Sequence, residues 1–335
     1  MAAVQQQVQQ QQQQQQLKQS FKTVEGRYRL TAERYPPTNG TNYRMARATR
    51  LTYANLRGAG DIDGPYLIYN VNDTLYISDA NCIDKEPYKS ITFPGLLPIC
   101  HAYQQAADGN DLLIGFFSGE VAVVSLRQQL LEPSRKLIAS ATHNAGGCFN
   151  ASRCTNVLWY PKEDGIFVST HADGSMYVFD KNKEPSSDPS FPTPKDPSAF
   201  SISYPKSSKS NPLARWTVCS SAINAAAFSP DGVMLALGGR DGIVRVFNPS
   251  LGQLVMGARS YYGAVLSVGW SKDAKFIVMG GEDDLVTVFS LSERQIVAWG
   301  EGHCSWVSSV AFDPHWTRPP PSDPGERVDP PPSIR

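Results

Sequence analysis

The second half of this 335-residue chain repeats one pattern at a fixed interval. The aromatic residues Phe228, Trp270 and Phe312 are each 42 residues apart, and the aspartates Asp241 and Asp283 keep the same interval. Each copy contains short alternating apolar runs separated by turns rich in Gly, Pro and Asp, which is typical of consecutive β-hairpins. A period of about 40–45 residues is that of a four-stranded propeller blade. We therefore predict an all-β fold, a β-propeller.

Five copies and the start of a sixth can be recognised. Three copies are clear and occupy residues 156–180, 224–248 and 267–290. Two weaker copies lie upstream, at residues 64–79 and 111–126. A further copy begins at Ser305 and offers one strand, Ser305–Asp313. We therefore expect an incomplete propeller of about five blades plus one strand, from a truncated or alternatively spliced form of a longer protein. Alternatively, the segment around Tyr28–Leu30 completes the ring.

Composition divides the chain into a repeat region and flanking segments. Residues 1–20 are rich in glutamine, and the nineteen residues from Thr317 contain seven prolines. Residues 183–212 are rich in Pro, Ser and Lys and lack periodicity, which favours a mobile excursion between strands. The predicted organisation is a disordered tail (1–20), an N-terminal extension (21–50), the propeller (51–316) with a mobile insert (183–212), and a disordered Pro-rich tail (317–335).

Conspicuous polar residues in the repeats are best interpreted as structural. Asp173, Asp241 and Asp283 occupy equivalent turns, where an aspartate accepts backbone N–H bonds and fixes the hairpin register. The pair Asp283-Asp284 resembles a general-acid or metal site, but Asp284 stands where the other copies carry glycine. His303 follows Gly302 at the start of a repeat, so we expect it to bond within a blade, to a turn aspartate, rather than to act in catalysis.

Composition and motifs exclude several function classes. Lys plus Arg and Asp plus Glu both total 31, so the chain lacks the basic excess that binding to nucleic acid or anionic membranes requires. There is no apolar stretch of 18 residues and no nucleophile elbow, zinc-protease helix or phosphate loop. None of the six cysteines forms a CxxC pair, so we expect reduced thiols in the cytoplasm or nucleus. We predict no enzyme and no cofactor.

The remaining histidines and two aromatic residues need separate treatment. His101, His143 and His171 fall in or beside expected strands, and a satisfied structural role is expected for each. Tyr262 and Trp306 each precede the innermost strand of a blade, where the connection opens onto one face. A large aromatic there is either a lid on the core or an exposed anchor for a partner. The sequence alone leaves these two interpretations equal.

Several stretches resemble one group of WD-repeat proteins. These include EGRYRL (25–30), GGEDDLVTVFS (280–290) and GHCSWVSSVAFDP (302–314). The chain is similar over most of residues 21–316 to the fungal catabolite-repression CreC type and its animal relatives, including the dystrophia-myotonica WD-repeat protein. Members of the wider family most often close with seven blades, and this group continues beyond the point where the present repeats stop.

The resemblance implies a regulatory subunit that binds and activates a ubiquitin-specific cysteine protease, with other WD-repeat proteins as further partners. By motif, the family's protease-contacting aromatics fall on Tyr262 and Trp306, although animal members carry phenylalanine at the position of Tyr262. The alternatives are a generic WD-repeat adaptor, such as a substrate receptor of a ubiquitin ligase, and a propeller enzyme. An enzyme would need convergent polar or metal-binding side chains around the central channel, and the sequence offers no such set.

Overall fold

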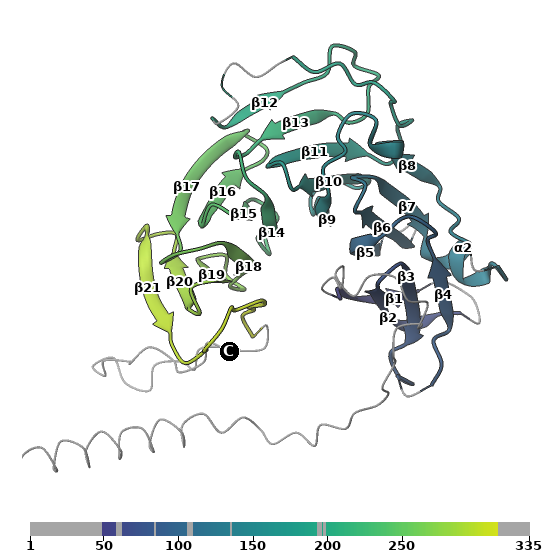
Figure 1. Ribbon diagram of the computed structural model, residues 1–335, viewed down its shortest axis with the longest axis horizontal. Helices are drawn as coiled ribbons and strands as arrows, with labels where there is room; N and C mark the ends of the chain where they lie inside the picture. The colour runs from purple at the N-terminus through teal and green to yellow at the C-terminus, as the bar shows by residue number, and fades with distance from the viewer. Residues whose placement is uncertain are drawn as a thin grey trace, which may run out of the picture. The chain divides into compact units, whose positions relative to one another are not determined.

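A computed structural model describes residues 49–57, 62–83, 85–105, 110–134, 136–192, 196 and 199–313. Within this part of the chain, almost every element is a β-strand (Figure 1). The exceptions are a short helix, α2 (Leu126–Leu131), and a 3₁₀ turn, η2 (Ala145–Gly147). No helix among the described residues is both long enough and apolar enough to cross a bilayer. The predicted tails, nearly all of the extension 21–50 and the Tyr28–Leu30 segment lie outside the described residues.

The strands form five antiparallel sheets that follow one another in sequence order. The first sheet contains β1 (Leu51–Leu56), β2 (Gly64–Val71), β3 (Thr74–Asp79) and β4 (Lys89–Thr92). The second contains β5 (Pro98–Gln105), β6 (Asn110–Phe116), β7 (Val121–Ser125) and β8 (Ala141–His143). The third contains β9 (Cys154–Trp159), β10 (Ile166–His171), β11 (Ser175–Asp180), β13 (Ala214–Thr217) and β12 (Ser201–Ser203).

The last two sheets correspond to two of the three clear sequence copies. The fourth contains β14 (Ile223–Phe228), β15 (Leu235–Gly239), β16 (Ile243–Asn248) and β17 (Gln253–Arg259). The fifth contains β18 (Val265–Trp270), β19 (Phe276–Gly281), β20 (Val286–Ser290) and β21 (Gln295–Gly300). In both sheets the four strands pair in simple sequence order, each with its neighbour. Five such sheets confirm the all-β propeller predicted from the period.

Local turn chemistry explains why the hairpins close where they do. Between β14 and β15, Ser229 Oγ donates to Asp231 Oδ1 (2.5 Å) and accepts from Met234 N (2.9 Å). Gly232 supplies the positive φ of 67° that the turn requires. The next sheet repeats this arrangement between β18 and β19, where Ser271 Oγ bonds Asp273 Oδ1 at 2.6 Å. Side-chain oxygens thus accept hydrogen bonds from backbone N–H groups of the turn that have no carbonyl partner in a neighbouring strand.

The hydrophobic core lies between sheets rather than within any one of them. Each of four buried clusters takes side chains from two consecutive sheets. Between the third and fourth sheets, for example, the ring of Phe247 meets Trp216 at 5.6 Å and Phe200 at 4.9 Å between centroids. Among the described residues, the three middle sheets bury both faces against their neighbours, and the first and fifth sheets bury one face each. The sheets therefore depend on one another for stability.

Two segments differ from what the repeat pattern predicts. The region 183–212 lies between β11 and β13 and contains β12, in which Ile202 pairs with Trp216. The sequence showed no period there, and its mobility remains a prediction. Ser305–Asp313 was expected to be the first strand of a sixth blade, and this expectation was wrong for the described residues. It forms no ladder, although Val307 and Val310 are buried and Val307 N donates to Gly281 O (2.9 Å).

Candidate protein-binding face

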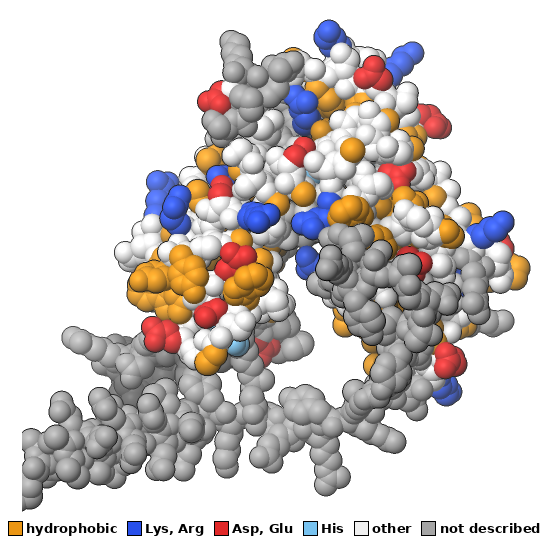
Figure 2. Space-filling model, viewed as in Figure 1, with side chains coloured by type: hydrophobic (Ala, Val, Ile, Leu, Met, Phe, Trp, Pro, Cys, Tyr) orange, Lys and Arg blue, Asp and Glu red, His pale blue; other side chains and the backbone are white. Residues whose placement is uncertain are grey.

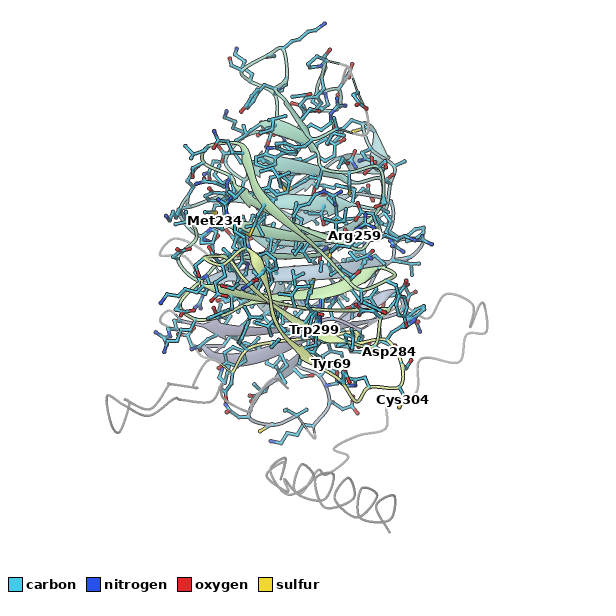
Figure 3. All side chains as sticks on the ribbon, turned by 90° about the vertical axis from the view of Figure 1, so that its left-hand side faces the viewer. Tyr69, Met234, Arg259, Asp284, Trp299 and Cys304 are labelled. Carbon is cyan, nitrogen blue, oxygen red and sulfur yellow. The ribbon has the colours of Figure 1, made fainter. Side chains whose placement is uncertain are left out.

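One end of the sheets carries the turns and loops that the sequence analysis singled out. We call this end the loop face. It consists of the turns between the second and third strands of each sheet and of the loops that lead into the next sheet. In the fourth and fifth sheets these are residues 239–242, 260–264, 281–285 and 301–306. Figure 3 shows Arg259, Asp284 and Cys304 on this side of the molecule and Met234 on the opposite side. All predicted site residues lie on the loop face.

The turn aspartate of the third sheet is fully engaged in hydrogen bonds. Asp173 Oδ1 accepts from Ser175 N (3.0 Å) and Ser175 Oγ (2.6 Å), and its Oδ2 accepts from Asn150 Nδ2 (3.0 Å). Asn150 belongs to the loop that enters this sheet, so the carboxylate ties that loop to the β10–β11 turn. The arrangement holds a hairpin in register and leaves no free carboxylate oxygen for chemistry.

Asp241 and Asp283 hold their turns in related ways. Asp241 Oδ1 accepts from Ile243 N (3.2 Å), and its two oxygens bind the guanidinium of Arg245 at 3.2 and 2.6 Å. Asp283 is buried, and it accepts from Leu285 N (3.3 Å) and from Tyr261 N (3.0 Å). Asp283 thus joins the β19–β20 turn to the loop that carries Tyr262.

Glycine recurs in these turns for a steric reason. Gly174 and Gly242 have φ of 83° and 77°, and a Cβ on either would strike the backbone of the loop that enters the next sheet. For Gly242 the nearest atom would be Gly263 O, at 2.5 Å. Asp284 has the equivalent conformation, with φ of 60°. Asp284 therefore adopts the backbone conformation that glycine has in the other turns. Asp283 and Asp284 are adjacent because both occupy structural positions of the turn.

The hydrogen bond expected of His303 cannot form with the described residues alone. Its side chain is exposed and has no hydrogen bond within the described residues. Elsewhere, the loop entering a sheet bonds the turn aspartate of that same sheet, as in Asn150 to Asp173 and Tyr261 N to Asp283. For His303 the corresponding turn would follow Asp313, outside the described residues. The bond from His303 to a turn aspartate of its own blade therefore stays a prediction, because that turn lies outside the described residues.

Tyr262 and Trp306 lie on either side of the β19–β20 turn. Two residues after Tyr262, Ala264 N donates to Glu282 Oε2 (2.9 Å), and Ala264 O accepts from Glu282 N (3.0 Å). One residue after Trp306, Val307 N donates to Gly281 O. The two loops are thus fixed to consecutive residues of one turn. The side chains of Tyr262 and Trp306 are 54% and 64% exposed, which excludes the interpretation of a lid on the core.

The exposed aromatic surface here is larger than the sequence analysis predicted. Tyr261 is 81% exposed, and its ring lies 6.0 Å from that of Tyr262. Trp299 is 60% exposed near the loop-face end of β21, opposite Thr287. Figure 2 shows hydrophobic side chains gathered over the fifth sheet, with acidic side chains among them. The sequence analysis missed Trp299 because its strand alternates like any other; β21 is the outermost strand of the fifth sheet, and Trp299 lies on this edge strand.

The buried histidines are only partly satisfied. His171 meets Ser152 O (3.0 Å) and Ser169 Oγ (2.9 Å), as expected of a structural residue. His101 Nδ1 meets Thr52 Oγ1 (2.7 Å), but its Nε2 has no partner in the described part of the chain. Neither ring nitrogen of His143 has one, and that ring packs against Phe167 and Phe179. The prediction of a satisfied histidine is therefore correct for His171, half correct for His101 and wrong for His143.

Comparison with known proteins agrees with this architecture. The family model described as "WD domain, G-beta repeat" matches residues 210–248, which include the first three strands of the fourth sheet, β14 to β16. The chain thus belongs to the WD-repeat family, whose members are generally non-catalytic protein-interaction scaffolds.

Two relatives carry a more specific name. The chain is 36% identical over 325 residues to the mouse protein "WD repeat-containing protein 20", an alignment that covers 93% of this chain and 56% of the relative. It is 33% identical over 272 residues to the Caenorhabditis elegans "WD repeat-containing protein 20 homolog", covering 74% of this chain and 34% of that protein. The chain thus spans about half the length, or less, of these relatives.

Proposed function

We propose that this chain is a non-catalytic regulatory subunit that binds and activates a ubiquitin-specific cysteine protease through the loop face of its fifth sheet. The observation that carries the proposal is the exposed pair Tyr262 and Trp306, fixed on either side of one turn. Large aromatics on a rigid support are the residues that dominate binding energy at protein interfaces. The same two positions are those that the family resemblance assigns to protease contact.

The chemistry of the face supports a binding role over a catalytic one. The carboxylates of Asp173, Asp241 and Asp283 each accept two or more hydrogen bonds from their own turn, the following strand or the loop that enters the sheet. Groups committed in this way stabilise loop positions and are poorly placed to exchange protons with a substrate. Activation would be allosteric, with the chain binding the active state of the protease more tightly than the inactive state.

Alanine substitutions at the two aromatics test the proposal. We expect Trp306→Ala and Tyr262→Ala each to weaken binding to the protease by about 2 kcal/mol or more, a loss of about 30-fold in affinity. Affinity would be measured by titration against a panel of purified ubiquitin-specific proteases. Activation would be followed with a fluorogenic ubiquitin substrate. Because both side chains are mostly exposed, the melting temperature should remain close to that of the unchanged protein.

Leu251→Ala is the matched control, because Leu251 is 66% exposed but lies in the β16–β17 turn, away from the loop face. It should leave binding and activation unchanged. Equal affinity in the Trp306 and Tyr262 variants would contradict the proposed contact surface. Failure of every protease in the panel to bind, combined with binding to a ubiquitin-ligase adaptor, would instead favour the generic adaptor.

A further inference from the structure

A second feature of the loop face is a pocket of about 540 Å³ that opens to solvent between the second, third and fourth sheets. Arg153 and Arg240 line it together with Ser220 and Ser221. Phe117, Ala172 and Ala222 complete the lining. Figure 2 shows basic side chains gathered where the innermost strands β9 and β14 reach this face. The pocket therefore combines two cations, two hydroxyl groups and a small apolar surface.

The backbone of both arginines is fixed. Arg153 O accepts from Ala172 N (2.9 Å), and Arg240 N donates to Ala222 O (2.8 Å). Each bond joins a loop that enters a sheet to the turn between the second and third strands of that sheet. The two guanidinium groups thus project from anchored positions on neighbouring sheets, and ordering them on a ligand would cost only side-chain entropy.

The charge of the two guanidinium groups is not compensated within the described residues. Neither side chain forms an ion pair or hydrogen bond there. Two acidic residues directly follow lining residues in the sequence, and both are already engaged. Asp173 follows Ala172 and is held by Asn150 and Ser175, and Asp241 follows Arg240 and is paired with Arg245. The pocket therefore carries an excess of positive charge in a chain whose formal net charge is zero.

We propose that this pocket binds a phosphorylated serine or threonine side chain of a partner protein. A phosphoryl group carries a charge of about −1.5 to −2 at pH 7 and three acceptor oxygens. Two guanidinium groups balance that charge, and their paired N–H donors fit its oxygens. The hydroxyl of Ser220 offers a further donor, and the apolar lining can cover the neighbouring part of a peptide. This inference does not depend on the proposed binding of a protease.

The test uses the whole chain and a fluorescent peptide library with one fixed phosphoserine flanked by random residues. The same library without the phosphate and a version with glutamate at the fixed position serve as comparison ligands. We expect binding to the phosphorylated library alone, weakened about tenfold or more by Arg153→Ala or Arg240→Ala. Arg259→Ala is the matched control because Arg259 is also exposed on the loop face but lies outside the pocket (Figure 3). It should bind as the unchanged protein does.

Each other outcome overturns the proposal. Absence of binding to the phosphorylated library, or equal binding by the Arg153 and Arg240 variants, would show that the pocket is not a phosphate site. Equal binding of the glutamate library would assign the pocket to acidic peptides in general. Thermal melting of each variant distinguishes loss of the ligand contact from loss of the fold, and Arg240→Lys, which keeps the charge but loses the paired donors, should retain only part of the affinity.

Discussion

Replacement of Gly174 by alanine is expected to destabilise the propeller by about 3–4 kcal/mol. Gly174 has φ of 83°, a conformation that costs an L-residue about 1–2 kcal/mol. The added Cβ would also lie 2.7 Å from Ser221 O and still closer to Cys219 O. Both are backbone atoms of the loop entering the fourth sheet, and Cys219 N and Val218 N bond to Gly174 O. Neither partner can therefore move without breaking the junction between sheets.

A substitution at a second glycine separates the conformational cost of the positive φ from the steric cost of the added Cβ. Gly95 has nearly the same φ, 80°, but its Cβ would meet no atom within 4 Å. Gly95→Ala should therefore show the conformational cost alone, about 1–2 kcal/mol. Chemical denaturation with urea measures both variants against the unchanged protein. Equal losses for the two would mean that the close approach of the turn to the loop does not constrain the repeat.

Acidification from pH 6.5 to pH 4 is expected to remove about 3 kcal/mol of stability for each of two buried histidines. Burial lowers the pKa of His101 to about 4 and the pKa of His143 to about 4, compared with about 6.5 in an unfolded chain. Between these two pH values, each histidine is protonated in the unfolded state but remains neutral in the folded state. The contribution of the two histidines to the free energy of unfolding is therefore fully present above pH 6.5 and falls between pH 6.5 and pH 4. Below pH 4 these two groups cause almost no further loss.

His143→Phe isolates one of the two contributions. The ring of His143 packs 5.2 Å from that of Phe167 and 5.0 Å from that of Phe179, and its nitrogens have no partner among the described residues. A phenyl ring should therefore fit the same place without the unsatisfied nitrogens. Urea denaturation at pH 7 and at pH 4 should show the variant losing about 3 kcal/mol less than the unchanged protein. An identical loss in both would contradict the titration of His143 in this window.

The sequence predicted the sheets well because their constraints are local and repeated. Asp241, Asp283 and the turn glycines recur at a fixed interval since each hairpin solves the same problem of register and close approach. Even the exception, Asp284 in place of glycine, was correctly interpreted from its position in the repeat. The resemblance to WD-repeat proteins agreed with this pattern, and the comparisons confirm the family.

What the sequence could not predict depends on contacts between distant segments. Strand β12 arises because Ile202 pairs with Trp216 across an insertion that has no period of its own. The basic pocket brings Arg153 and Arg240 together from different sheets, and neither stands out in its own repeat. His143 has an ordinary strand position, and only its burial among aromatic rings reveals that its nitrogens are unsatisfied. The exposure of Tyr262 and Trp306 likewise depends on how the loops of the fifth sheet are packed.

Hydrogen exchange of the chain, measured with and without a purified protease that binds it, tests the central claim most directly. We predict that the protease slows exchange in the two loops beside the β19–β20 turn, residues 259–264 and 301–307. Exchange in the turns at the opposite end of the same sheets, residues 229–234 and 248–252, should not change. Protection confined to those opposite turns, with residues 259–264 and 301–307 unaffected, would contradict the assignment of the loop face as the binding surface.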